Sequence, residues 1–151
     1  MKKVILLIFI CILSFTLCGC SKRVISTDKF MNITNNHQLK NSDVSKNYKD
    51  VKDLNKVIFA VSEDDWQIEF YVFDNNDASK KMYDNNKVYY NNYLKNSLYH
   101  EDSTSKKVDE YTLIEDERYT HVCRVKNTLL YVTAPIDSKT DVEKVLRALK
   151  Y

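Results

Sequence analysis

Apolar residues alternate along the segment from Val57 to Phe73, on both sides of the acidic stretch Ser62-Glu63-Asp64-Asp65. Successive side chains of a strand point to opposite faces, so this period of two predicts a β-hairpin. If Glu63-Asp64 forms the turn, Val57 lies opposite Phe70 on the core face. The chain must therefore build part of its core on an antiparallel sheet.

Further along the chain the pattern predicts two helices. Asp74 to Asp77 provide a cap for the first, whose apolar residues recur at spacings of three and four from Ala78 to Leu98. The second follows Pro135, where Thr140-x-x-Glu143 resembles a capping box. Its apolar stripe consists of Val142, Val145, Leu146 and Leu149. Between the helices, the hydrophilic stretch from Tyr99 to Lys107 is expected to be a mobile loop.

A three-stranded meander is predicted from Val108 to Ala134, with turns near Asp116-Glu117 and Asn127-Thr128. The expected fold is therefore α+β, with an antiparallel sheet of about five strands in the order hairpin, helix, meander and C-terminal helix. Both long helices are expected on one face of the sheet, the side of Trp66, Phe70 and Val132.

The N-terminus has the pattern of an export signal. Lys2 and Lys3 precede an apolar run, Val4 to Leu17, that is shorter than the about 20 residues of a membrane-spanning helix. The run ends in Leu17-Cys18-Gly19-Cys20, which resembles the lipobox of bacterial lipoproteins. That resemblance implies lipid attachment to Cys20 and a stable anchor on the extracytoplasmic side of the cell membrane. The alternative is a plain secretory signal or an uncleaved anchor.

The resemblance implies a signal peptide at 1–19. The polar composition after it indicates a tether at 20–53, and the strand and helix patterns indicate one globular domain at 54–151. Ser26 or Thr27 is expected to cap a short helix within the tether. The strand that reads Ile68-Glu69-Phe70-Tyr71 before a helix is also similar to small uncharacterised bacterial lipoproteins. This second resemblance carries no function. Cys123 is the one cysteine after Cys20, so no intramolecular disulfide is expected.

Composition excludes two classes of function. The one glycine, Gly19, lies in the predicted leader, whereas phosphate-cradling loops and dinucleotide fingerprints are built on glycine. The chain has 23 basic and 21 acidic residues, and Lys2 and Lys3 are lost with the leader. Nucleic acid is therefore not an expected partner, because its binders need a net basic face. Turns must use Asn and Asp, including the pairs Asn35-Asn36, Asn75-Asn76, Asn85-Asn86 and Asn91-Asn92.

Three groups of residues could carry chemistry. His121 and Cys123 share a strand face, but a zinc site needs three or four ligands, so a core histidine and a buried thiol are favoured. His100-Glu101-Asp102 lies in the expected loop, which would not hold a catalytic geometry. The acidic turns Glu63-Asp64-Asp65 and Glu115-Asp116-Glu117 lack the ligand pattern of a calcium loop. We expect no catalytic residue, cofactor or metal.

The reverse side of the predicted sheet is the candidate binding face. It carries Tyr71, Phe73, Tyr111, Arg124 and Tyr131. Tyrosine and arginine are enriched at recognition surfaces, because each combines apolar area with a directional polar group. The competing interpretation is that the N-terminal segment folds back over this face through Phe30 and Ile33.

These features favour a non-enzymatic, lipid-anchored module that binds an envelope protein or a cell-wall ligand. The rival hypothesis is a hydrolase that acts on envelope polymers. Its paired carboxylates would be Glu69 with Asp109 or Glu110.

Overall fold

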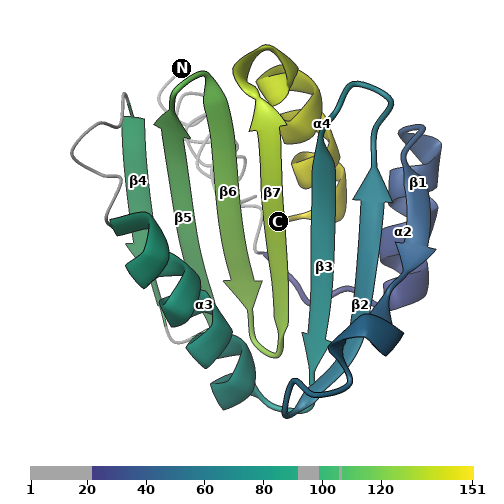
Figure 1. The fold of residues 1–151 in the computed structure, drawn as a ribbon, viewed down its shortest axis with the longest axis vertical. Coiled ribbons are helices and arrows are strands. Elements are labelled where there is room, and N and C mark those ends of the chain that lie inside the picture. Colours follow the sequence, from purple (N-terminus) through teal and green to yellow (C-terminus); the bar gives the residue numbers. More distant parts are fainter. Residues whose placement is uncertain (1–21, 92–98, 106) are drawn as a thin grey trace, which may run out of the picture.

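The computed structural model describes residues 22–91, 99–105 and 107–151, and Figure 1 shows one sheet with helices on both of its faces. The elements in chain order are α2 (Thr27–Asn36), β1 (Lys40–Asp43), η1 (Ser45–Tyr48), β2 (Leu54–Val61), β3 (Gln67–Phe73), α3 (Asn76–Asn91), β4 (Tyr99–Thr104), β5 (Val108–Glu115), β6 (Arg118–Val125), β7 (Thr128–Pro135), η3 (Ile136–Ser138) and α4 (Lys139–Leu149). The sheet has 7 strands in the order β1-β2-β3-β7-β6-β5-β4, and every neighbouring pair is antiparallel. The predicted α+β class with an antiparallel sheet is confirmed.

The two edge strands, β1 and β4, raise the strand number above the prediction. β1 reads Lys-Asn-Ser-Asp and β4 reads Tyr-His-Glu-Asp-Ser-Thr, so neither shows apolar alternation. An edge strand pairs through its backbone on one side only, and polar side chains suit its exposed position. The mobile loop predicted from Tyr99 is therefore wrong, because β4 pairs with β5 along its whole length.

The segment predicted as a polar tether, 20–53, contributes to the fold. The short helix is present as α2, where the Ser26 side chain accepts a hydrogen bond from the Lys29 backbone N–H at 3.3 Å. Phe30 of this helix is fully buried and stacks on Phe70, with ring centroids 4.7 Å apart. The folded unit therefore begins before residue 54, since Phe30 and the pairing of β1 with β2 attach the segment to the sheet.

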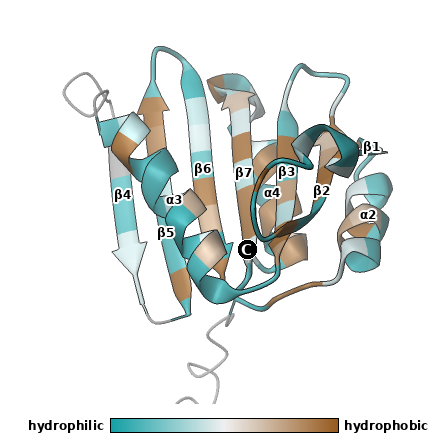
Figure 2. Ribbon diagram, turned by 60° about the horizontal axis from the view of Figure 1, so that its bottom comes forward, coloured by the Kyte–Doolittle hydropathy of each residue, from teal (hydrophilic) through white to brown (hydrophobic). Residues whose placement is uncertain are grey.

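The prediction that both long helices cover one face is also wrong. α2 and α4 pack on the face of Phe70 and Val132, and Figure 2 shows brown, apolar segments along the central strands. α3 packs on the opposite face, where its Tyr83 is buried against the tyrosine-bearing side of the sheet. We call these the α4 face and the α3 face.

α4 carries its predicted apolar stripe, whose members Val142, Val145, Leu146 and Leu149 are all buried. The predicted capping box does not form, because the helix starts at Lys139 and its N-cap, Ser138, makes no side-chain capping bond. Pro135 ends β7, as predicted.

The first hairpin differs from its predicted register by one residue. Its loop runs from Ser62 to Trp66, closes through a backbone hydrogen bond of 2.8 Å, and places Asp65 at a φ of 57°. Ile58 therefore lies opposite Phe70, in place of Val57. Because side chains alternate between faces, this one-residue shift sends Val57 to the α3 face.

The meander turns form without glycine. Asp116 and Glu117, at the predicted turn, have φ angles of 45° and 63°. At the next turn, Val125 pairs with Thr128 in place of the predicted Leu130. A shift of two residues leaves every side chain on its predicted face. The pairs Asn35-Asn36, Asn75-Asn76 and Asn85-Asn86 lie within helices or at a helix start.

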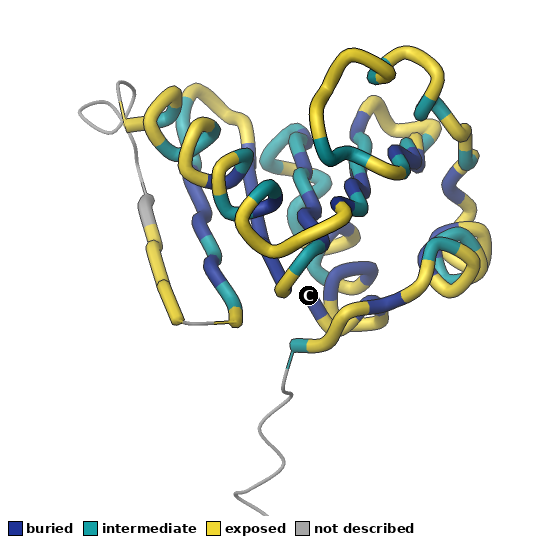
Figure 3. Tube along the Cα trace, turned by 90° about the horizontal axis from the view of Figure 1, so that it is seen from below, coloured by how far each residue is buried: buried dark blue, intermediate teal, exposed yellow. Residues whose placement is uncertain are grey.

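Figure 3 shows the buried residues concentrated in the central strands, between the helices of the two faces. Within the described part of the chain, no helix combines the length and apolar character needed to cross a membrane. The predicted signal peptide and the predicted helical residues 92–98 lie outside the described ranges.

Candidate functional site

The residues of the predicted binding face lie together on the α3 face, but most of them are inaccessible. Tyr71, Phe73, Tyr111 and Arg124 are buried, and Tyr131 is half-buried. α3 covers part of this face, and Tyr48 of η1 packs edge-on against Tyr71 with ring centroids 6.1 Å apart. These residues therefore do not form one exposed recognition surface.

Arg124 has a structural role in the interior. Its Nε donates to the Asp109 carboxylate at 2.5 Å, and its guanidinium also donates to the Lys126 carbonyl at 2.9 Å. Arg124 is 3% exposed and Asp109 is 0% exposed. A charge removed from water must be paired and hydrogen-bonded. Arg124 pairs with Asp109 through Oδ2, while Asp109 Oδ1 is buried without a hydrogen-bond partner among the described residues.

An open cleft of about 420 Å³ remains on the α3 face, between the last turn of α3 and the turn that joins β5 to β6. We call it the tyrosine cleft. Its lining includes Tyr89, Tyr90, Leu113, Glu115, Arg118 and Tyr131. Tyr131 is the member of the predicted binding face that reaches it, whereas Tyr89 and Tyr90 belong to the helix that the sequence analysis assigned to the other face.

The tyrosines of the cleft hold one another in place. The Tyr90 and Tyr131 hydroxyls are hydrogen-bonded, and their rings stack with centroids 6.3 Å apart. Tyr89 packs edge-on against Tyr90 at 5.2 Å. Burial raises the pKa of Tyr90 and of Tyr131, so both phenols are protonated at neutral pH. The cleft therefore presents fixed rings and hydroxyl groups.

Charged groups lie at the mouth of the same cleft. Arg118 projects from β6 and donates a hydrogen bond to the Thr133 hydroxyl at 2.8 Å. Glu115 and Asp116 line the cleft beside it, at the turn predicted from the sequence. The sequence predicts this acidic turn but not the cleft beside it.

The carboxylates of the hydrolase hypothesis do not converge. Glu69 and Asp109 share the α3 face, but β7 and β6 lie between their strands. Three inter-strand spacings of about 4.8 Å separate them by about 14 Å, beyond the about 5 to 9.5 Å of glycosidase carboxylate pairs. Glu110 lies on the other face of the sheet, with His121 and Cys123.

Glu69 itself is half-buried, and burial raises the pKa of its carboxyl group. Hydrogen bonds from the Tyr71 hydroxyl and, at 2.6 Å, from Gln67 Nε2 oppose that rise. Its two bonding partners lie on the same strand, so Glu69 is held along β3 and does not line the tyrosine cleft.

His121 and Cys123 point toward the α4 face, as predicted, and Glu110 of β5 joins them there. Burial lowers the pKa of His121 to about 3 and raises the pKa of the Cys123 thiol to about 12. Both groups are therefore neutral at pH 7, and the thiol is a poor nucleophile. The position of Glu110 beside Cys123 could have been predicted from the sequence, because the predicted turn at Asp116-Glu117 already places these two residues opposite each other.

The remaining candidate residues from the sequence do not come together in one site. In β4, Asp102 pairs with Lys87 of α3, and its strand neighbour Glu101 lines a pocket under α4, on the other face. The turn residues Glu63, Asp64 and Asp65 are exposed. Cys20 lies outside the described residues.

The comparisons with known proteins reveal a likeness of fold. No protein-family model matches the chain, and no curated protein matches it. The crystal structure of a GTP binding regulator from Thermotoga maritima is similar over 83% of this chain and 88% of that chain, with a TM-score of 0.53 and 15% sequence identity. At that identity the likeness shows the fold alone.

Proposed function

We propose that this protein is a lipoprotein anchored through Cys20 to the extracytoplasmic side of the cell membrane, and that its domain binds a cell-wall fragment in the tyrosine cleft without catalysing a reaction. The observation that carries the binding role is the cleft itself. Its volume of about 420 Å³ falls within the range of about 300 to 1,000 Å³ typical of ligand pockets.

The chemistry of the lining suits a ligand that is partly apolar and rich in polar groups. Tyr89 is 58% exposed and offers ring surface, while the Tyr90 and Tyr131 hydroxyls offer directional hydrogen bonds. Arg118 can bind a carboxylate, and Glu115 can accept from hydroxyl or amide donors. A peptidoglycan fragment contains sugar hydroxyls, amides and carboxylates together.

The first described residue, Lys22, lies on the side of the sheet opposite the cleft. Lys22, two residues after Cys20, contacts Glu110 and Cys123 on the α4 face. Two residues span at most about 7 Å, so the lipid would be attached close to the α4 face. The tyrosine cleft would then face away from the membrane, toward the cell wall.

The wide separation of Glu69 and Asp109 disfavours the hydrolase, because hydrolysis needs two carboxyl groups beside one bond. No observation in the described ranges favours the hydrolase over the binding module. We therefore retain it only as an outcome of the binding experiment below.

Metabolic labelling with a radioactive or clickable fatty acid tests the anchor. The wild-type chain should incorporate the label, and Cys20→Ser should lose it entirely. Cys18→Ser is the matched control, because it changes the neighbouring cysteine of the same motif and should keep the label. An unlabelled wild-type chain, or label retained by Cys20→Ser, would overturn the anchor.

Titration of the full chain in detergent with soluble peptidoglycan fragments tests the cleft. Tyr89→Ala and Arg118→Gln should each weaken binding about tenfold, which corresponds to about 1.4 kcal/mol. Val88→Ala is the control, because Val88 is also exposed on α3 and does not line the cleft. Equal affinities for Tyr89→Ala and Val88→Ala would exclude the cleft, and cleavage of the fragments would favour the hydrolase.

A further inference from the structure

A second group of functional side chains lies on the α4 face, away from the tyrosine cleft. β5 and β6 pair so that Glu110 is opposite Cys123 and Thr112 is opposite His121. Directly opposed residues of an antiparallel pair point to the same face. The register thus supplies Glu110, the third ligand that His121 and Cys123 lacked in the sequence.

These three side chains form a compact donor set. One Glu110 carboxylate oxygen, one His121 ring nitrogen and Cys123 Sγ all lie within 4.8 Å of one another. The distance from His121 Nε2 to Glu110 Oε1 is 3.6 Å, too long for a hydrogen bond. Two adjacent central strands hold all three residues, and such strands position side chains more rigidly than a loop does.

The imidazole of His121 is oriented for a ligand. Its Nδ1 is 3.0 Å from the Thr112 hydroxyl, which fixes the ring. Its Nε2 is buried and has no hydrogen-bond partner among the described residues, although His121 is only 4% exposed. Metal-bound histidines are held in this way, with one ring nitrogen bonded to a neighbouring polar group and the other bound to the ion.

A cation already contacts the cluster. The Lys22 ammonium donates to the Glu110 carboxylate and lies 3.7 Å from Cys123 Sγ. Lys22 belongs to the segment before α2, which has no regular secondary structure, so its ammonium reaches the cluster from outside the sheet. The Glu110 carboxylate therefore already binds a cation, and a metal ion could replace the Lys22 ammonium there.

We propose that Glu110, His121 and Cys123 bind a divalent transition-metal ion of the zinc class, which displaces the Lys22 ammonium. Carboxylate, imidazole and thiolate are the three ligand types that Zn²⁺ accepts. Mg²⁺ and Ca²⁺ take oxygen ligands, so they do not suit a site with a thiol and an imidazole.

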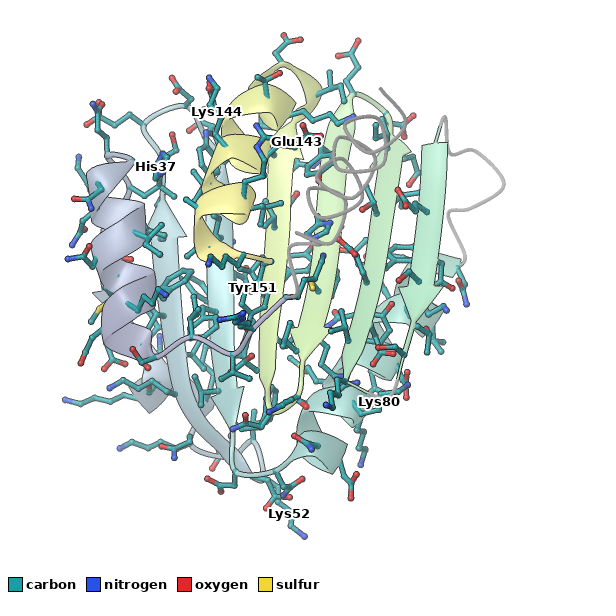
Figure 4. The ribbon with its side chains drawn as sticks, turned by 180° about the vertical axis from the view of Figure 1, so that it is seen from behind. His37, Lys52, Lys80, Glu143, Lys144 and Tyr151 are labelled. Atoms are coloured by element: carbon teal, nitrogen blue, oxygen red, sulfur yellow. The ribbon has the colours of Figure 1, made fainter. Side chains whose placement is uncertain are left out.

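The geometry needs only a small contraction. Ligands at about 2.0 to 2.3 Å from a tetrahedral ion lie about 3.3 to 3.8 Å apart, within about 1 Å of the separations in the cluster. Glu110 and His121 also line a pocket of about 230 Å³ together with residues of α4, and a fourth ligand such as water would come from this pocket. Figure 4 shows α4 with Glu143, and the chain end at Tyr151, on this side of the sheet.

Cobalt binding tests the proposal directly, because a thiolate ligand gives Co²⁺ a near-ultraviolet charge-transfer band. The full chain in detergent, stripped of metal with a chelator, should bind one Co²⁺ and show that band. Zn²⁺ should then displace the cobalt and raise the thermal midpoint, as a ligand of the native state does. Equal concentrations of Mg²⁺ and Ca²⁺ should leave the midpoint unchanged.

Four variants assign the ligands. Cys123→Ser should lose the charge-transfer band, and Glu110→Gln should weaken Zn²⁺ binding at least tenfold. Lys22→Met should strengthen binding several-fold, because it removes the competing ammonium. Glu143→Gln is the matched control: Glu143 lines the same pocket but is paired with Lys139 and Arg147 on α4, each at 3.7 Å.

Two results would overturn the metal site. One is a wild-type chain that shows no charge-transfer band at stoichiometric Co²⁺. The other is a loss of Zn²⁺ affinity in Glu143→Gln as large as that in Glu110→Gln. Neither result bears on the tyrosine cleft, because the cleft lies on the other face and its variants leave this cluster intact.

Discussion

The two faces of the sheet are built from different kinds of residue. The α4 face is closed by two helices over a core that is mostly aliphatic residues and phenylalanines, including Phe30, Phe70, Leu130 and Val132, and it contains two tyrosines, Tyr119 and Tyr151. The α3 face is covered by one long helix and η1, and six of its packed residues are tyrosines that carry polar hydroxyls: Tyr48, Tyr71, Tyr83, Tyr90, Tyr111 and Tyr131.

We relate this difference to two roles, with the α4 face contributing mainly to stability and the α3 face carrying the proposed binding cleft. Aliphatic side chains pack to a closed core, whereas each buried tyrosine must also satisfy a hydroxyl group. The α3 face meets that demand with hydroxyl bonds such as Tyr90 to Tyr131, and it leaves the tyrosine cleft open. The α4 face also holds polar groups: the cluster of Glu110, His121 and Cys123, and smaller contacts such as the bond between the Thr128 and Tyr151 hydroxyls. The proposed binding cleft and the proposed metal site thus lie where each face departs from close apolar packing.

The largest effect should come from the buried charges of the α3 face. Arg124→Leu leaves the Asp109 carboxylate buried without its partner, which should lower the free energy of unfolding by about 3 to 5 kcal/mol. Replacing both residues with leucine should recover most of that loss. Urea unfolding measures both variants, and a double variant as unstable as Arg124→Leu would show that the charge is not the cause.

Two neighbouring leucines compare the faces directly. Leu129 and Leu130 are both fully buried, and they point to the α3 face and the α4 face respectively. Leu130→Ala should cost about 3 kcal/mol and Leu129→Ala about 2 kcal/mol, because the open cleft lets the α3 face relax around a cavity. Chemical denaturation ranks the two variants. The reverse order would mean that the α3 face is packed as rigidly as the other.

Lowering the pH should reduce the free energy of unfolding through His121, in the polar cluster of the α4 face. Burial holds the pKa of His121 at about 3, below its unfolded value of about 6.5, so the unfolded state binds the extra proton between these values. The stabilisation is complete above pH 6.5 and is lost as the pH falls toward 3. Between pH 7 and pH 5 the loss should be about 2 kcal/mol.

Urea unfolding of the metal-free chain at both pH values checks this dependence, and His121→Gln should remove most of it. His37→Gln is the control, because His37 is exposed at the end of α2. An unchanged pH dependence in His121→Gln would assign the effect to other groups. The raised pKa of Glu69 acts in the opposite direction and is common to all three proteins.

The smallest effect concerns the hydroxyl pair of the cleft. Tyr90→Phe and Tyr131→Phe should each cost about 1 kcal/mol, since each removes one partner of a part-buried hydrogen bond. The double variant should cost less than the sum of the two single variants, because the bond is lost only once. Thermal unfolding of the full cycle measures the coupling, and strict additivity would show that the hydroxyls do not interact in solution.

Strands with a buried face were predictable, and polar strands were not. β3 and β7 show apolar residues in alternation, so the sequence reveals them. β1 and β4 each pair with one neighbouring strand, and their mostly polar residues resemble those of a loop.

The sites illustrate the same limit. The sequence placed Tyr131 on a face with Arg124, which is where both residues lie, but it could not show that α3 covers that face. It identified His121 and Cys123 as a possible pair but assigned Glu110 to the hydrolase carboxylates, although its own predicted turn places Glu110 opposite Cys123.

The amino-acid sequence by itself determined the antiparallel character of the sheet, the stripe of α4 and the lack of glycine-based nucleotide loops. The first two depend on residues a few positions apart, so local periodicity predicts them, and the third follows from composition alone. Tertiary structure decided the face on which α3 packs, the pairing of the two edge strands and the convergence of Glu110 with His121 and Cys123. Those outcomes depend on how surfaces far apart in the chain fit together, a quantity that no local pattern contains.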